Sequence, residues 1–153
     1  QLSLANLPSP LSFAREVQTV RLLTRDDRSV SGTFRLAFRH KNFVWQSQPI
    51  RPNATASGEL DSVETILESI PGVGDVSVVR SVQTQLPGDA YQWTIAFAPE
   101  AGDVPQLELL DNSLSNNAEV LCSTLEQGQG YRLRFLLQDA AGTKVQLDSN
   151  SVA

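Results

Sequence analysis

Hydrophobic residues alternate with polar ones along most of this chain, a pattern typical of β-strands that bury one face. In 33–39, for example, Phe34, Leu36 and Phe38 alternate with charged or smaller residues. A turn around Pro87-Gly88 is expected to join two such segments into a hairpin. Strands are predicted over or near 17–22, 33–39, 76–82, 91–97, 106–110, 118–125, 130–138 and 143–148.

One segment has the period of a helix instead. Its apolar positions, spaced by three and four residues with acidic residues between them, are Leu60, Val63, Leu67 and Ile70. Thr55 or Ser57 is expected to cap its N-terminus, and Pro71-Gly72 to end it, which predicts a helix at about 57–70. The fold class predicted is therefore mostly β with one helix, an α+β β-sandwich or immunoglobulin-like module.

The two chain ends differ from the middle. Residues 1–12 contain Pro8 and Pro10 and alternate Leu2 with Leu4, which predicts an extended N-terminal arm. Residues 13–127 are expected to form the β-rich core, and residues 128–153 a C-terminal hairpin.

An aromatic-Arg-Leu-x-Phe segment occurs twice, at 34–38 and at 131–135, and each copy follows a Glu-Val pair. Either a second repeat begins after Glu119, or two amphipathic strands merely look alike. An incomplete second unit would have an exposed hairpin that seeks a complementary surface.

Composition and charge narrow the class of protein. The chain of 153 residues is 41% hydrophobic and 19% charged, which is typical of a folded domain. The net charge of −5 argues against nucleic acid as a partner, and no apolar run is long enough for membrane insertion. Residues 1–52 carry a net charge of +5 and residues 53–153 one of −10, so the two parts could attract each other within one domain or head to tail between copies.

The chain has no methionine and starts at Gln1, which favours a protein processed behind a removed signal peptide and an extracellular, secreted or cell-surface location. Cys122 is the only cysteine, so no disulfide can form within the chain. Two interpretations of Cys122 remain open: it is a buried small hydrophobic residue, or it forms an intermolecular disulfide.

Candidate chemistry is sparse. His40 is the sole histidine and is expected to be a solvated turn residue, and Glu64 and Glu68 are expected to be solvated on the polar face of the helix. No zinc, calcium, phosphate-loop or dinucleotide motif occurs, so no catalytic residue, metal or cofactor is predicted. Asn53-Ala54-Thr55 is an N-glycosylation sequon, although Thr55 could equally serve as a helix cap.

Aromatic residues offer an alternative function. Phe43, Trp45, Tyr91 and Trp93 could form a platform that stacks on sugars, although the alternation around Trp93 favours a core position for that residue. An exposed coplanar pair would indicate sugar binding, whereas buried aromatics would favour assembly.

Five short motifs occur in a fixed order. They are G-T-F-R-L-A-F at 32–38, N-A-T-A at 53–56, I-P-G-V-G-D-V-S-V at 70–78, W-T-I-A-F at 93–97 and G-D-V-P at 102–105. Over residues 16–127 the chain resembles a tandem repeat of about a hundred residues found in large secreted and surface proteins of algae, other protists and some bacteria. The resemblance implies an extracellular α+β or immunoglobulin-like unit used as a spacer, adhesive or fibre component, without catalytic residues. The turn at 39–42 and Ser57-Gly58 depart from the pattern.

The predicted function is that of a structural subunit of an extracellular filament, fibril or repeat array, a glycoprotein that assembles head to tail by exchange of strands or arms between copies. The alternative is a carbohydrate-binding or adhesive surface module. The expected partners are copies of the chain itself, with glycans as a further candidate. The residues expected to mediate assembly are Leu2, Leu4, Leu7 and Leu11 of the arm and Tyr131, Leu133 and Phe135 of the hairpin.

Overall fold

Strands dominate the structure, as the alternating pattern predicts. The computed structural model describes residues 14–83, 90–128, 132–138 and 144–150, the last two ranges as backbone only. The elements are β1 (Val17–Leu23), β2 (Phe34–His40), β3 (Phe43–Gln46), α1 (Val63–Glu68), β4 (Val76–Val82), β5 (Tyr91–Phe97), the 3₁₀ turn η2 (Pro99–Ala101), β6 (Glu108–Asn112), β7 (Glu119–Glu126), β8 (Arg132–Gln138) and β9 (Lys144–Asn150). The predicted mostly β fold with one helix is confirmed.

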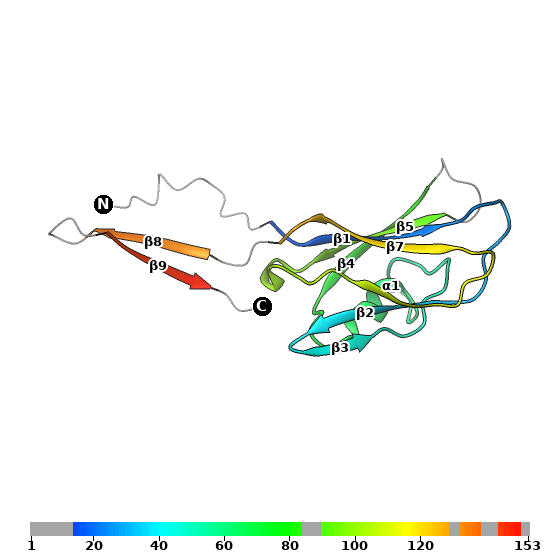
Figure 1. Ribbon diagram of the computed structural model, residues 1–153, viewed down its shortest axis with the longest axis horizontal. Coiled ribbons are helices and arrows are strands. Elements are labelled where there is room, and N and C mark those ends of the chain that lie inside the picture. The colour runs from blue at the N-terminus through cyan, green and yellow to red at the C-terminus, as the bar shows by residue number, and fades with distance from the viewer. Residues whose placement is uncertain (1–13, 84–89, 129–131, 139–143, 151–153) are drawn as a thin grey trace.

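Two antiparallel sheets face each other (Figure 1). The larger sheet has the order β4-β5-β1-β7, and the smaller has the order β3-β2-β6. The predicted hairpin of β4 and β5 is confirmed, with Val76 opposite Phe97 and Val82 opposite Tyr91. β7 pairs along the whole of β1 and thereby completes the larger sheet.

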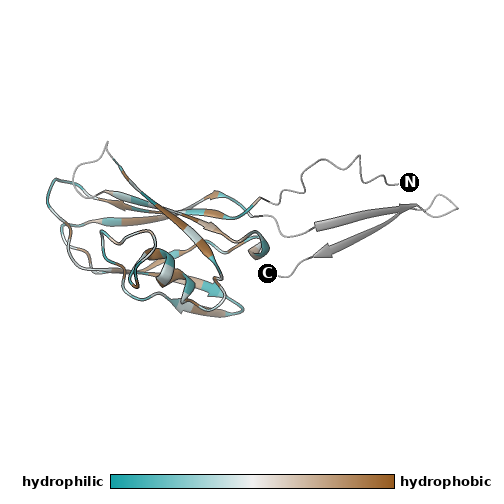
Figure 2. Ribbon diagram, turned by 180° about the vertical axis from the view of Figure 1, so that it is seen from behind, coloured by the Kyte–Doolittle hydropathy of each residue, from teal (hydrophilic) through white to brown (hydrophobic). Residues whose placement is uncertain are grey.

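The core lies between the sheets and is built mainly from alternate residues of the strands, with further apolar residues from α1. Trp93, Phe34, Phe38 and Phe97 are its largest fully buried side chains. The rings of Phe34 and Trp93 lie 6.0 Å apart, and the indole Nε1 of Trp93 donates to the carbonyl of Ala54 at 3.0 Å. The core position expected for Trp93 is confirmed, and Figure 2 shows the hydrophobic bands that recur along the strands.

The helix is shorter than predicted. Ser62, not Thr55 or Ser57, is its N-cap, and the Ser62 hydroxyl accepts from the amide of Thr65. The preceding loop supplies the reason, because the amide of Val63 donates to the carbonyl of Thr55 across eight residues. Gly58 adopts a left-handed φ of 88° in this loop, which breaks any helix running through it. Leu60, expected on the apolar face, is 93% exposed.

A two-residue turn joins β2 to β3. Lys41 and Asn42 both have positive φ, 46° and 66°, while His40 and Phe43 pair on either side. This is the geometry of a type I′ hairpin, which suits the twist of the adjoining strands. The turn at 39–42, which departs from the pattern of the repeat, therefore has this type I′ geometry.

A buried polar network ties the start of β1 to the end of β7. Glu16 is 1% exposed, and its carboxylate accepts from the amide of Gly128 at 2.6 Å and from the Gln18 side chain at 3.1 Å. The Gln18 amide oxygen accepts from the backbone of Leu107 at 2.9 Å. Gly128 has no room for a side chain, since a Cβ atom would overlap the carbonyl of Gly102.

The second Glu-Val pair lies in a different environment. Glu119 is exposed and Val120 is buried, whereas Glu16 is buried and Val17 half-buried. β8 and β9 pair with each other, from Arg132 opposite Asn150 to Gln138 opposite Lys144. Within the described residues they form a sheet of their own and pair with neither sheet of the sandwich.

Candidate functional site

The edges of the two sheets are where this fold can take up another chain. A strand at a sheet edge presents backbone N–H and C=O groups that have no partner strand, and these groups pair readily with a further strand. The sandwich, as far as the structure describes it, has four edge strands, β4 and β7 in the larger sheet and β3 and β6 in the smaller. The four edges differ in whether side chains bind their outward backbone groups.

The β4 edge is covered by α1. The carboxylate of Glu68 accepts from the amide of Val76, and that of Glu64 accepts from the amide of Val78, both at 3.2 Å. The two carboxylates lie one helical turn apart and the two amides two residues apart, so helix and strand match in spacing. The expectation that Glu64 and Glu68 are merely solvated is wrong.

Arg80 extends this cover along β4. Its guanidinium donates to the carbonyls of Asn53 and Ala54 at 2.7 and 3.1 Å and lies 4.8 Å from the centre of the Tyr91 ring. The loop before α1 is thereby held against β4. Another strand would have to displace both the carboxylates and this loop.

Side chains from β6 and from the segment before it bind backbone groups of the β7 edge. Gln106 donates to the carbonyl of Cys122 at 3.2 Å and accepts from the Thr124 hydroxyl at 2.9 Å. At the other end, Asn112 donates to the carbonyl of Ala118 at 2.9 Å. These side chains use backbone groups of the β7 edge, which leaves fewer of them for an added strand.

β3 differs from the other edges in carrying no charge. All four of its residues are exposed, including Phe43 at 66%, Val44 at 52% and Trp45 at 38%. Phe43 pairs with His40, and the amide of Ser47 donates to the carbonyl of Leu36, so alternation directs the backbone groups of Val44 and Gln46 away from β2. Within the described residues nothing pairs with these outward groups. The edge is thus both open and apolar.

The aromatic residues do not form the expected sugar platform. Trp93 is buried, and Tyr91 is half-buried beneath Arg80. Of the four, only Phe43 and Trp45 are exposed together, with centroids 6.1 Å apart and planes inclined by 47°. The pair is therefore not coplanar, and coplanarity was the feature expected of a sugar-binding surface.

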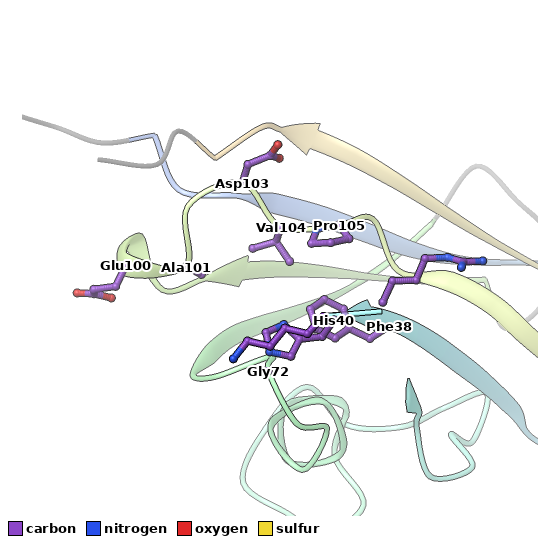
Figure 3. Close-up of a pocket in the computed structure, with 10 residues that line it drawn as sticks. Phe38, His40, Gly72, Glu100, Ala101, Asp103, Val104 and Pro105 are labelled. Carbon is purple, nitrogen blue, oxygen red and sulfur yellow. The ribbon is translucent and has the colours of Figure 1, made fainter. Parts of the chain in front are cut away.

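A hollow of about 360 Å³ lies beside the end of β2 and contains His40. The imidazole stacks on the Phe38 ring, with centroids 6.2 Å apart and planes 15° apart. Gly72, with a φ of 89°, makes room for the ring, because a Cβ atom there would come within 2.5 Å of it. Figure 3 shows the carboxylates of Glu100 and Asp103 on the opposite wall pointing away from His40. The histidine is half-buried by packing, not the solvated turn residue expected.

Two other predicted residues can be located. Asn53 is exposed in the loop before α1, where the side chain of the sequon faces solvent. Cys122 is half-buried in β7 and packs against the core. Burial, and secondly the negative charge of Glu108, raise the pKa of its thiol to about 11.

The residues expected to mediate assembly fall mostly outside the described part of the chain. Leu2, Leu4, Leu7, Leu11 and Tyr131 lie outside the described residues. The backbones of Leu133 and Phe135 lie in β8, opposite Ser149 and Leu147 of β9.

Comparisons with protein-family models, with curated proteins and with solved structures found no match for this chain. The resemblance to an extracellular repeat therefore stays a prediction from its motifs.

No group of three or more His, Cys, Asp or Glu residues that could hold a metal occurs in the described ranges. The one α-helix described is too short and too polar to cross a membrane.

The open edge was not recognised from the sequence. In the sequence, Phe43 and Trp45 have the character of candidate sugar contacts, and no pattern distinguishes Val44. A usable signal does exist, since a turn-forming Lys41-Asn42 precedes four uncharged residues, three of them large and apolar. A short strand of this kind without a polar face is what an unprotected edge looks like.

Proposed function

We propose that this chain is a non-catalytic structural subunit that joins copies of itself head to tail through extended segments. The observation that carries the proposal is the open β3 edge, with three exposed apolar side chains and, within the described residues, unpaired backbone groups at Val44 and Gln46. Natural sheets usually protect such an edge, and an unprotected one is a template for another strand. Because an edge and an arm are different surfaces, their contact is heterologous and propagates as a fibre unless it closes into a ring.

The distribution of charge supports the same arrangement. Residues 1–52 are net positive and the rest of the chain is net negative, so unlike ends of successive copies attract each other. Part of this attraction is used within the sandwich, where Arg25 pairs with Glu119 and Arg39 with Glu108. These pairs are exposed and contribute little to stability, which leaves the charges accessible to a neighbour.

A non-catalytic role is supported by the surroundings of His40. Its ring packs on Phe38 and on the backbone of Gly72, and the two carboxylates that line the hollow with it point elsewhere. A histidine that activates a nucleophile is typically oriented by a third group, and neither of these carboxylates points at this one.

The exposure of Asn53 is compatible with an N-glycan in a secreted protein. Intact-mass measurement before and after glycosidase treatment tests that part of the proposal, and an unchanged mass in native material would refute it.

The proposal is tested on the purified full-length chain. Sedimentation velocity over a hundredfold range of concentration should show growth from monomers to extended polymers, and negative-stain electron microscopy should show threads of uniform width. A compact monomer at every concentration would refute the proposal. A closed dimer would also refute it, because its contacts close after two copies and cannot propagate as a fibre.

A further inference from the structure

Among the edge strands that the structure describes, β3 is the one with neither a charged residue nor side chains bound to its outward backbone groups. At the β4 edge, carboxylates of α1 already bind the amides of Val76 and Val78. At the β7 edge, Gln106 and Asn112 bind backbone carbonyls. β3 has no comparable cover among the residues described. Its four residues carry no charge, so the usual electrostatic protection of an edge is missing as well.

The donor is identified by length and by charge. Thirteen residues precede the described structure, and Arg15 is the first charged residue of the chain. Leu2 and Leu4 alternate with Ser3, which gives a strand one apolar face. At about 3.3 Å per residue, residues 1–7 extend over about 23 Å, whereas the four residues of β3 need only about 13 Å.

We infer that residues 1–7 of one copy add as a further strand to the β3 edge of the next copy, with Leu2 and Leu4 beside Phe43 and Trp45. This inference rests on the proposed function and specifies which surfaces of successive copies meet. The added strand forms backbone hydrogen bonds with the outward N–H and C=O groups of Val44 and Gln46. Its leucines make apolar contacts with the aromatic side chains of β3. Pro8 and Pro10 follow the alternating segment, and their fixed φ favours an extended spacer that carries it away from its own domain.

The hairpin of β8 and β9 is a poorer donor for this edge. Its strands carry Arg132, Arg134 and Lys144 against a single acid, Asp148. β3 is itself preceded by Lys41, which is exposed, so like charges would meet. The uncharged arm meets no such repulsion.

The first test replaces one outward amide. Val44→Pro removes the N–H that an added strand needs and leaves the pairing of β3 with β2 intact, because that amide points away from β2. Val44→Thr is the matched control, which keeps both the amide and the β-branched shape. In the full-length chain, Val44→Pro should raise the concentration needed for polymerisation at least tenfold, and Val44→Thr should change it less than threefold. Circular dichroism should be the same for both variants. Equal polymerisation of the two variants would overturn the inference.

The second test does not depend on how well Val44→Pro folds. Ser3→Cys is combined with Val44→Cys, with Cys122→Ser to remove the native thiol, and the protein is oxidised at a concentration at which it polymerises. The control combines Ser3→Cys with Val79→Cys, which lies on the covered β4 edge and is 63% exposed. We expect a ladder of disulfide-linked dimers, trimers and longer species for the Val44 pair, and far less for the Val79 pair.

The alternative outcomes are distinguishable. A cross-linked monomer in place of the ladder would mean that the arm lies on its own β3, which overturns the inference. Equal ladders from both pairs would mean non-specific contact, and this result overturns it as well. If the chain polymerises but neither test singles out β3, the proposed function stands and only this contact is wrong. If the full-length chain stays monomeric, the proposed function itself fails.

Discussion

Glu16 shows how much a single residue can hold together in this fold. It is almost fully buried at the point where the chain enters β1, and its two carboxylate oxygens accept from the side chain of Gln18 and the amide of Gly128. Through Gln18 the network continues to the backbone of Leu107. A buried carboxylate is stable only with such partners, and the partners in turn need its oxygens.

Glu16→Ala should therefore destabilise the protein by about 2–4 kcal/mol, because the buried amide of Gly128 loses its acceptor and the Gln18 side chain loses one of its three. Glu119→Ala serves as the control, since that side chain is exposed and pairs with the exposed Arg25, and its effect should stay below about 1 kcal/mol. Urea denaturation followed by tryptophan fluorescence, to which the buried Trp93 contributes, measures both. An equal, small effect of the two substitutions would show that the Glu16 network contributes nothing.

Cys122 is expected to be an unreactive thiol. With its pKa raised to about 11, very little of the reactive thiolate exists at pH 8, so labelling by iodoacetamide should be slow in the folded protein and fast in urea. Because the folded pKa lies above that of the unfolded chain, the associated stability is present below about pH 9 and is lost as the pH rises towards 11. Cys122→Ala should remove this loss. Rapid labelling of folded protein at pH 8 would contradict the prediction.

At the scale of elements, α1 acts chiefly as a cover for β4. Its six residues are too few to be stable alone, and its buried residues Val63, Ile66 and Leu67 hold it against the core. That packing places Glu64 and Glu68 over the amides of the edge strand. The helix thereby protects an edge that would otherwise be as open as that of β3.

Replacing Glu64 and Glu68 together by alanine should uncover the β4 edge. We expect a loss of about 1–2 kcal/mol from two charge-assisted hydrogen bonds and faster hydrogen exchange at the amides of Val76 and Val78. The amide of Ser77 faces β5 and should keep its protection, which makes it an internal control. If all three amides exchange alike, the helix has come loose as a whole and the specific role of the carboxylates is not supported.

The elements differ in how well local sequence predicts them. β2, β4 and β5 were predicted because alternation is a local property that burial of one face imposes. The start of α1 was not, because a bond between residues eight apart, Thr55 to Val63, holds the preceding loop. β3 was not, since it buries neither face and so shows no alternation. The cover of β4 and the burial of Glu16 depend on residues distant in sequence and could not be predicted locally.

For the whole molecule, the candidate site divides into a part that the sequence indicated and a part that only the fold supplies. The apolar arm and the unequal charges are visible in the sequence, and they suggested assembly. The acceptor is defined only by the fold, because in the described sandwich side chains bind the backbone of the β4 and β7 edges, whereas the β3 edge has neither such cover nor a charge of its own. A donor can be recognised from its own residues, whereas an acceptor is defined by what the rest of the fold leaves uncovered.

Deleting residues 1–12 should leave the sandwich folded and abolish long polymers. Each leucine of the arm would contribute on the order of 1.5–3 kcal/mol when buried, before the cost of ordering the arm. Sedimentation velocity should then show monomers or short species, with an unchanged circular dichroism spectrum. A control that replaces Leu2 and Leu4 by serine keeps the length of the arm and should act in the same direction. Polymers of undiminished length would argue against the arm as donor.

The antiparallel pairing of β1 with β7 has a mechanical consequence. Val17 lies opposite Glu126, and Glu16 holds Gly128, so the chain enters and leaves the sandwich at one end. Tension between the two chain ends would peel these strands apart one pair at a time, with the Glu16–Gly128 bond loaded first, and peeling needs less force than shearing. A thread linked from arm to β3 transmits tension through β1, the core and β3 instead. The pairing of β1 with β7, which peels easily, then bears no load.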